Sequence, residues 1–443
     1  MTKRRKFLFV SKDGLSGDVA LKLVQEGHEA KFYLKDPESR DVYDGFFEKV
    51  KNWRHHVSWA DVIIFDDSNY GESAQKLRKA GKKVVGGSRY TDKLEINREF
   101  GQEELKKLGI NTLPSWEFND YNKAINFIKK TPNRYVFKPS GKEQSYNKRL
   151  VIVSEEEDGS DLIDFLRNNR RTLRRKIPRF LIQEFVGGIE IAVGAFFNGE
   201  KFIRPVNVNF EHKRLFTGNL GPMTGEAGTM MFWADSNPIF ERTLEKITPA
   251  LQKAGYVGYL DLNCIVNKKD IYPLEFTGRF GYPTIQIQLE GILDETGEWL
   301  YKLACGRNFD LHTKEGFQIG VVIFTPPAFS EGEDTETAET YRDIAIRFEK
   351  EDREGVHIFD VKNDNGIWRV AGISGWNLVA TGSGKDIPEA RKIAYRRVRN
   401  IQIPHMFYRQ DIGLRNIWEL NLLKKWGYLP DSTVSNGANA KLD

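Results

Sequence analysis

The stretch that decides the fold lies past the middle of the chain, where residues 256–283 read YVGYLDLNCIVNKKDIYPLEFTGRFGYP. Two apolar runs in it, 257–266 and 271–276, predict strands. The polar residues 267–270 between them form a turn sequence. The stretch therefore predicts a β-hairpin.

Two carboxylates on this hairpin are expected to meet. Asp261 lies in the first strand and Glu275 in the second, which would place them close together on one face. Like charges so near each other are costly unless a cation lies between them, and Mg²⁺ (or Mn²⁺) with a nucleoside triphosphate is the cation that the pair predicts. From these residues alone, two solvated strand carboxylates remain an equal alternative.

Two basic residues elsewhere suggest contacts with anions. Arg279, which is flanked by glycines just after the hairpin, can clamp a carboxylate or phosphate with two hydrogen bonds. Lys138 ends the apolar run 135–137 before a small-residue loop and can point its ammonium at a polyphosphate. The simpler alternatives are a surface turn for Arg279 and a solvated strand end for Lys138.

Two glycine-containing segments add to this pattern. Residues 183–190, QEFVGGIE, lie between two predicted strands, where exposed backbone groups can pair with an adenine edge and Glu190 can hold ribose hydroxyls. Residues 211–214, EHKR, precede the loop 218–228, whose four glycines can supply backbone N–H donors to an anion. A plain hairpin and a plain glycine-rich loop are the alternatives.

Working outward, the first hundred residues alternate between strand and helix. Strands are expected at 6–10, 30–34, 62–65 and 83–85, with helical patterns between them. This alternation predicts a parallel sheet covered by helices, whose ligands lie outside the carboxyl ends of the strands, at the loops 11–18 and 66–71.

The rest of the chain has a different pattern of predicted helices, loops and strands. Residues 92–108 predict one helical stretch, and longer loops with alternating strands follow to about residue 310. A third region begins near residue 317 with a buried-type strand at 320–325. In it, residues 328–341 predict an acidic loop and residues 387–401 a helix.

Composition bounds the class of protein. A chain of 443 residues suggests about three domains. Its 40% hydrophobic and 29% charged content is that of a globular protein, and no run reaches the roughly 18 apolar residues of a spanning helix. The apolar run 7–10 is too short for a signal peptide, and two cysteines cannot form a disulfide framework, so a cytoplasmic location is expected.

Basic residues cluster in one later segment. The net charge of +5, from 67 basic and 62 acidic residues, does not by itself indicate nucleic-acid binding. A solvated helix face is the favoured interpretation of the basic run, with a nucleic-acid or nucleotide contact as the alternative. The run comprises Arg167, Arg170, Arg171, Arg174, Arg175, Lys176 and Arg179.

Taken in order, these features resemble the ATP-grasp fold, and specifically the glycinamide ribonucleotide synthetase (phosphoribosylamine–glycine ligase) family. The strongest parts of the resemblance are residues 211–228, residues 256–283 with their LEF and RFG sequences, and residues 406–413, MFYRQDIG. The resemblance implies an N-terminal parallel α/β substrate domain (1–91), an ATP-grasp domain (92–315) with a mobile lid (about 115–182), a small mixed α/β domain (316–429) and a polar tail (430–443).

The resemblance also implies an ATP-dependent carboxylate–amine ligase that uses Mg²⁺ or Mn²⁺. Such an enzyme would join glycine to phosphoribosylamine through a glycyl phosphate in purine biosynthesis, releasing ADP and phosphate. Its partners would be small molecules, with neither a membrane nor a nucleic acid expected.

Site residues carry over position by position. Arg98 and Lys138 would hold the ATP phosphates, Glu184, Phe185 and Val186 the adenine, Glu190 the ribose, and Lys213 the γ-phosphate. Asp261 and Glu275 would hold the metal, Arg279 and Lys213 would act in catalysis, and Gly14, Ser16, Gly17, Thr224, Gly225 and Arg279 would contact the other substrates.

Departures from the family pattern leave the substrate open. Lysine is usual at the position of Arg98 and asparagine at that of Thr277, while Tyr282 and Thr284 replace acidic residues. The first loop, DGLSGD at 13–18, lacks the family's GGREH sequence, and Asp18 would disfavour an anion there. A ligase for another amine or amino acid and a non-catalytic nucleotide-binding relative therefore remain alternatives.

Overall fold

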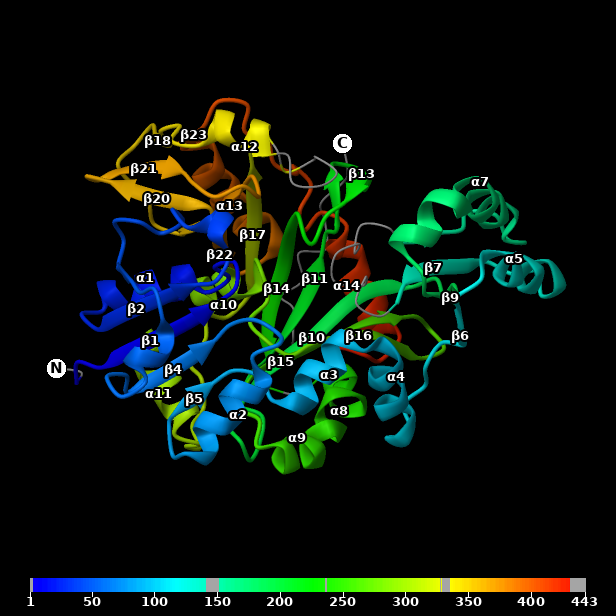
Figure 1. The fold of residues 1–443 in the computed structure, drawn as a ribbon, viewed down its shortest axis with the longest axis horizontal. Coiled ribbons are helices and arrows are strands. Elements are labelled where there is room, and N and C mark those ends of the chain that lie inside the picture. The colour runs from blue at the N-terminus through cyan, green and yellow to red at the C-terminus, as the bar shows by residue number, and fades with distance from the viewer. Residues whose placement is uncertain (1–2, 141–150, 236, 327, 329–334, 431–443) are drawn as a thin grey trace. The chain divides into compact units, whose positions relative to one another are not determined.

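The computed structural model describes residues 3–140, 151–235, 237–326, 328 and 335–430 (Figure 1). The chain divides into two compact units. Unit 1 comprises Met1–Asp92, Ile191–Asp261 and Thr277–Asp443, and unit 2 comprises Lys93–Glu190 and Leu262–Phe276. The domain boundaries expected from the sequence stay predictions. No helix in the described part of the chain combines the length and the apolar character needed to cross a membrane.

A five-stranded parallel sheet forms the N-terminal part of unit 1, with the order β3-β2-β1-β4-β5. Its strands are β1 (Lys6–Ser11), β2 (Glu29–Leu34), β3 (Glu48–Lys49), β4 (Val62–Phe65) and β5 (Val84–Val85). The helices are α1 (Gly17–Gln25) and α2 (Gly71–Lys79), with short 3-10 turns η1 (Pro37–Ser39) and η2 (Trp53–His56). Buried Leu8, Ile63 and Phe65 pack against Trp53 and Ala74. The predicted alternation of strand and helix is confirmed.

A second sheet, antiparallel from β10 to β19, forms the rest of unit 1 with the order β15-β10-β11-β14-β17-β22-β19. Its strands are β10 (Ile189–Phe197), β11 (Val206–Glu211), β14 (Gly228–Ala234), β15 (Gly258–Val266), β17 (Phe317–Phe324), β19 (Val356–Ile358) and β22 (Trp376–Gly384). Three two-stranded ribbons accompany it: β12 (Arg214–Phe216) with β13 (Leu220–Met223), β18 (Arg347–Phe348) with β23 (Ile401–Gln402), and β20 (Val361–Asp364) with β21 (Ile367–Val370).

The helices of this part of unit 1 are α8 (Pro238–Arg242), η3 (Leu244–Ile247), α9 (Thr248–Ala254), α10 (Thr284–Gly291), α11 (Thr296–Ala304), α12 (Thr335–Tyr341), α13 (Ile387–Arg399) and α14 (Asn416–Lys425). Helix α13 lies directly on β22 because two glycines of that strand carry no side chain. A Cβ atom on Gly382 or Gly384 would fall 2.4 Å from the backbone nitrogen of Ala394 or Ala390. The helix is capped by Asp386, whose carboxylate accepts the Glu389 N–H.

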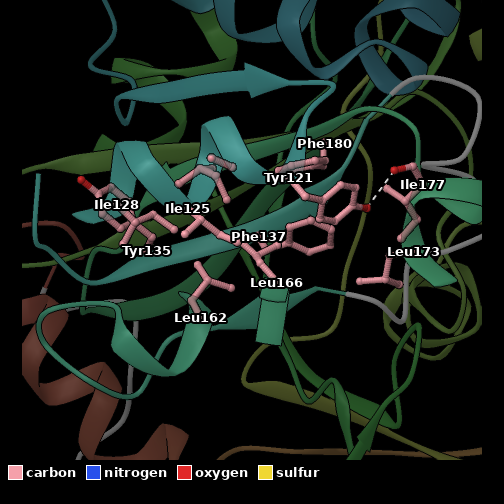
Figure 2. Close-up of a cluster of buried hydrophobic side chains, with 12 residues drawn as sticks. Tyr121, Ile125, Ile128, Tyr135, Phe137, Leu162, Leu166, Leu173, Ile177 and Phe180 are labelled. Atoms are coloured by element: carbon pink, nitrogen blue, oxygen red, sulfur yellow. Dashed lines mark hydrogen bonds between the residues drawn. The ribbon is translucent and has the colours of Figure 1, made fainter. Parts of the chain in front are cut away.

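Unit 2 contains a four-stranded sheet, with the order β6-β9-β7-β8, and two helices that pack on it. The strands are β6 (Ser115–Phe118), β7 (Tyr135–Pro139), β8 (Ile152–Val153) and β9 (Phe180–Glu184), and the helices are α5 (Tyr121–Lys130) and α7 (Ser160–Lys176). Figure 2 shows their side chains meeting in one buried cluster, where the Tyr121 hydroxyl donates to the Ile177 carbonyl at 2.9 Å. Unit 2 also holds α4 (Arg98–Lys107) and most of β16 (Ile271–Thr277); only Thr277, the last residue of β16, belongs to unit 1.

Three local predictions were wrong. The stretch 92–108 is two helices, α3 (Arg89–Ile96) and α4, because Asn97 leaves the helical conformation and its side chain caps α4 by accepting the Phe100 N–H. The acidic loop 328–341 ends in α12, and the loop 218–228 contains β13. The predicted tail lies outside the described residues after position 430. The mixed α/β class, with a parallel N-terminal sheet and an antiparallel core, is confirmed.

Candidate active site

A pocket of about 140 Å³ lies within unit 2. Residues of α4, β6, β7, β9 and β16 line it: Arg98, Glu99, Gln102, Glu103, Lys106, Ser115, Glu117, Lys138, Leu181, Gln183 and Leu274. The structure thus brings Arg98 and Lys138, two residues expected at the ATP phosphates, to one cavity although they are forty positions apart in the sequence.

Lys138 is held in place by a neighbouring strand. It lies near the end of β7, opposite Leu181 of β9. Its ammonium donates to Oε1 of Gln183 at 2.7 Å, and Gln183 is buried. This hydrogen bond to a neutral amide fixes the position of the ammonium at the pocket.

Arg98 begins α4 and makes an ion pair with a predicted metal ligand. Its Nη2 lies 2.9 Å from Oε2 of Glu275, with 11% of the Arg98 side chain and 36% of the Glu275 side chain exposed. One turn later, the Gln102 amide donates to the carbonyls of Pro273 and Leu274. Helix α4 is therefore fastened along β16, which fixes both charges at the pocket.

The predicted adenine-binding segment follows β9. The N–H groups of Glu184 and Phe185 donate to the carbonyls of Pro114 and Arg134, each at 2.9 Å. The Arg134 guanidinium lies 3.8 Å from the centre of the Phe185 ring. These contacts hold the start of the segment, while the adenine-binding role of Glu184, Phe185 and Val186 and the ribose-binding role of Glu190 stay predictions.

Asp261 sits in a buried polar network of unit 1. Its Oδ2 accepts hydrogen bonds from the Tyr259 hydroxyl at 2.9 Å and from the Asn209 amide at 3.1 Å. Burial, together with the nearby Glu211 carboxylate, raises the pKa of Asp261 to about 8. Lys213, 3.4 Å from Glu211, opposes that shift. Asp261 belongs to unit 1 and Glu275 to unit 2, so their shared metal site stays a prediction.

Arg279 faces the carboxyl ends of the first sheet. Its Nε lies 4.0 Å from Oδ1 of Asp67, which follows β4, and its Nη1 donates to the Phe280 carbonyl. Burial and the Asp67 charge raise the pKa of Asp13, in the loop after β1, to about 6, while Arg279 lowers it. The two loops that the parallel sheet predicted as ligand sites therefore form one polar region together with Arg279.

The first loop is engaged with a carboxylate. The Ser16 N–H and hydroxyl both donate to Oδ2 of Asp66, at 2.8 and 2.5 Å. Burial raises the pKa of Asp66 to about 7, although its hydrogen bond with Ser16 opposes the shift. The Tyr43 hydroxyl donates to the Gly14 carbonyl, and a Cβ on Gly17 would fall 2.0 Å from the Tyr43 ring. Any side chain at position 17 would therefore require the Tyr43 ring to move.

Asp18 turns away from the loop. Its Oδ2 lies 2.6 Å from Nδ1 of His357, and its Oδ1 accepts the Ile358 N–H at 3.1 Å. The carboxylate at the start of α1 thus ties this helix to β19 within unit 1. The Asp18 side chain is consequently committed to a structural contact.

Lys213 and the glycine-rich segment form a compact ribbon. The N–H and hydroxyl of Thr224 both donate to the Lys213 carbonyl, at 2.8 and 2.7 Å. Gly225 lies against the Trp376 ring, which a Cβ would approach to 3.1 Å. Lys213, predicted at the γ-phosphate, and Thr224 and Gly225, predicted at the other substrates, therefore lie side by side in unit 1.

Comparison with known proteins decides the class of this site. Residues 96–285 match the family model described as the phosphoribosylglycinamide synthetase, ATP-grasp (A) domain. Residues 96–285 are an ATP-grasp domain. All the pocket-lining residues, and Lys213, Asp261, Glu275 and Arg279, lie within this ATP-grasp domain.

Curated relatives extend the likeness beyond the ATP-grasp domain. The phosphoribosylamine–glycine ligase of Clostridium acetobutylicum is 25% identical over 433 residues, covering 92% of this chain and 99% of the relative. That of Helicobacter pylori strain J99 is 27% identical over 357 residues, covering 77% and 78%.

Solved structures share the fold. The crystal structure of phosphoribosylamine–glycine ligase from Thermotoga maritima has a TM-score of 0.69 at 21% identity, covering 92% of this chain and all of that one. The biotin carboxylase domain of Hydrogenobacter thermophilus 2-oxoglutarate carboxylase, solved with MgADP and bicarbonate, has a TM-score of 0.61 at 12% identity, covering 96% of each chain.

A segment outside the ATP-grasp domain supports its ribbon, and this gives the sequence MFYRQDIG a physical role. Arg409 is buried, and its guanidinium pairs with Asp411 at 2.6 Å and donates to the Arg214 carbonyl at 2.7 Å. Asp411 in turn accepts the Gly218 N–H at 3.0 Å. Both ends of the β12–β13 ribbon are thereby anchored.

The donor set of the ATP-grasp domain fits a magnesium ion. Among the residues that the structure describes, no group of three or more histidine, cysteine or acidic side chains could hold a metal ion by itself. Mg²⁺ usually takes one or two carboxylates and completes its shell with substrate phosphates and water. Burial and then the Glu211 charge raise the pKa of Asp261. Asp261, Glu211 and Glu275 each offer the hard oxygen ligands that this ion prefers.

Sequence reasoning assigned no role to several residues at these sites. Gln183 was not seen as the partner of Lys138, since nothing in a strand sequence shows which side chain faces it. Glu211 could have been found from the pattern Asn207, Asn209, Glu211, because alternate residues of a strand share one face. Asp66 lay in a loop that was singled out, but its bond to Ser16 depends on the pairing of β1 with β4.

Proposed function

We propose that this chain is an ATP-dependent ligase that joins glycine to phosphoribosylamine in purine biosynthesis. The observation that carries the proposal is the pocket of the ATP-grasp domain, where Lys138 and Arg98 meet beside Glu275. The names of the full-length relatives support glycine and phosphoribosylamine as the substrates.

The proposed reaction has two steps. The glycine carboxylate attacks the γ-phosphorus of ATP and ADP leaves, which gives glycyl phosphate. The amine nitrogen then attacks the acyl carbon, phosphate leaves, and the amide nitrogen loses a proton. Neither step needs a covalent bond to the protein, so catalysis rests on positioning and on charge stabilisation.

Each residue has a proposed part in this scheme. Lys138 and Arg98 bind the phosphates, the backbone at Glu184–Val186 holds the adenine, and Glu190 holds the ribose. Lys213 faces the γ-phosphate, and Arg279 orients the glycine carboxylate with its fixed fork of donors.

Asp261 and Glu275 are the proposed ligands of Mg²⁺, with Glu211 as a further candidate. When bound, the ion would neutralise charge that develops on the transferred phosphoryl group. The free thiols Cys264 and Cys305 support a cytoplasmic location for the reaction.

A second acceptor amine is favoured by one observation. The Ser16 N–H at the first loop donates to Asp66, and Asp13 and Asp67 lie in the same polar region. Carboxylates there repel a phosphate and attract an amine or a hydroxyl group. A ligase of the same chemistry that takes an amine without a phosphate is therefore the second candidate.

The test is ADP release by the full chain with ATP, Mg²⁺ and glycine, with and without phosphoribosylamine, followed by a panel of other amines and amino acids. Release that requires glycine and phosphoribosylamine together, with the glycinamide product seen by mass spectrometry, supports the proposal. Release with an unphosphorylated amine instead supports the second candidate. Release with none of these pairs would show that the chain is not such a ligase.

A further inference from the structure

Positive charge is concentrated on the two helices of unit 2. Helix α7 carries six basic and two acidic residues, and α5 carries three lysines and no acidic residue. Together they hold a net charge of +7 in 27 residues, whereas the whole chain has a net charge of +5. The remainder of the chain is therefore slightly acidic, so this charge is localised and is not part of a generally basic surface.

The arginines of α7 occupy the side of the helix away from the core. Leu162, Leu166 and Leu173 are buried, and Figure 2 shows them in the cluster that α5 shares. Five arginines of α7 are exposed. They lie on one broad face of the helix, because residues three, four and seven positions apart lie on the same side of a helix. They are Arg167, Arg170, Arg171, Arg174 and Arg175.

Few of these arginines form ion pairs within the described part of the protein. Arg167 pairs with Asp164 at 2.6 Å. Arg170 donates to the neutral side chain of Asn122 at 3.1 Å, which joins α7 to the start of α5 beside the exposed Lys123. Among the described residues, no carboxylate lies within 4.0 Å of a charged nitrogen of Arg171, Arg174 or Arg175.

Helix α13 provides the contrast. It has five basic residues and one acidic residue, but Arg397 pairs with Glu290 and Glu354, and Arg391 donates to backbone carbonyls. Much of the charge of α13 thus serves internal contacts, while that of α7 faces solvent. Self-repulsion among solvent-facing arginines is a cost that an anionic partner would remove.

We propose that the exposed face of α5 and α7 binds the phosphate backbone of a duplex nucleic acid. Arginine matches phosphate geometry with two parallel hydrogen bonds. Positions 167 to 175 span about 12 Å along the helix at ~1.5 Å per residue, a length over which one strand of a duplex presents three or four phosphates.

Other polyanions fit this face less well. In the described part of the chain, none of the exposed large apolar side chains lies on α5 or α7. The face therefore has no residue to insert into a lipid bilayer and no aromatic ring on which unpaired bases could stack. Backbone contacts alone imply binding without sequence preference.

The sequence by itself favoured a solvated helix for the basic run. The sequence pattern did not show that the basic helix α5, some forty residues earlier, lies in the same layer as α7 in the folded unit. The inference is independent of the ligase reaction, because it concerns the face of α7 away from its own core.

The experiment is fluorescence anisotropy of a labelled 30-base-pair DNA duplex titrated with the full chain. The test variant is R171Q/R174Q/R175Q, and the matched control is K392Q/R396Q/R399Q on the exposed side of α13; glutamine keeps helix propensity in both. Circular dichroism and thermal unfolding confirm that both variants are folded.

We expect the wild-type protein to bind the duplex at 50 mM NaCl and to lose affinity by about 100-fold at 200 mM, as four phosphate contacts predict. The α7 variant should bind at least ~10-fold more weakly at 50 mM, and the α13 variant within twofold of the wild type. Absence of binding, an equal loss in both variants, or tighter binding to phosphatidylserine vesicles than to the duplex would each overturn the proposal.

Discussion

Replacing Lys138 by methionine tests the phosphate pocket most directly. Methionine keeps most of the length and volume of the side chain but removes the ammonium that Gln183 holds at 2.7 Å. A hydrogen bond to a charged group contributes about 1.5–3 kcal/mol. At ~1.4 kcal/mol per factor of ten, the substitution should weaken ATP binding by roughly 10- to 150-fold.

The structure also predicts a smaller effect on stability. Loss of the ammonium leaves the buried Gln183 amide oxygen without that donor, which costs about 1–3 kcal/mol if no water replaces it. The unfolding midpoint in urea should fall accordingly, and far-ultraviolet circular dichroism should not change.

The assay is isothermal titration calorimetry with a non-hydrolysable ATP analogue and Mg²⁺. The exposed Lys268 lies in the turn before β16, and Lys268→Met removes the same charge from the same unit away from the pocket. Its affinity should match that of the wild-type protein. An unchanged affinity in Lys138→Met, or an equal loss in both variants, would refute the place of Lys138 at the triphosphate.

Three further predictions concern metal, pH and packing. Glu275→Gln should lower ADP formation at least ~100-fold, because the substitution removes a proposed anionic ligand of the metal. The fold should be retained, because Glu275 is partly exposed and the cationic Arg98 can still donate a hydrogen bond to the glutamine oxygen. Turnover near the wild-type rate would exclude Glu275 as a metal ligand. The pKa of Asp66 is about 7 in the native state, against an ordinary value of 3.8. Between pH 3.8 and about 7, the native protein therefore keeps a proton on Asp66 that the unfolded chain has released. The contribution of Asp66 to the free energy of unfolding is consequently lost as the pH rises through this window. In Asp66→Asn, the free energy of unfolding should fall less between pH 4.5 and pH 7.5, as measured by urea unfolding; each pKa unit of the shift corresponds to about 1.4 kcal/mol. The same change with pH in the variant and the wild-type protein would contradict the shift. Gly17→Ala should destabilise the protein by about 1–3 kcal/mol, measured by urea unfolding, because its Cβ would lie 2.0 Å from the Tyr43 ring, and a neutral effect would show that the ring moves freely.

Much of the fold could be predicted from local patterns. The strands β1, β2 and β4 were expected within a residue of their ends, because continuous apolar runs bounded by polar turns are typical of buried strands. Their parallel arrangement was expected from the alternation of strand and helix, but the order of the strands in the sheet was not predicted. The break at Asn97 was missed because helical periodicity continues through the cap.

The site could be predicted only where a single residue carries the chemistry. Lys138 was expected at a phosphate because it ends a strand before a small-residue loop, whereas Arg98 was expected there only from the family resemblance; the fold brings both to one pocket. Partner choice could not be predicted, since Gln183, Tyr43 and His357 reach their sites through strand pairing and long-range packing. The resemblance to a known family supplied the residue roles, which composition and spacing left open.

The contact between Asp18 and His357 has a consequence for biosynthesis. The two residues are 339 positions apart, and the chain of unit 2 is made between them. At about 5–20 residues per second, a ribosome needs roughly 15–70 s to reach His357 after Asp18 has been made. Throughout that time α1 lacks its partner strand β19, so the nascent first sheet presents an unfinished face to chaperones and proteases. A product that terminates before β19 would keep that face permanently, and is expected to be degraded even though its first five strands are complete.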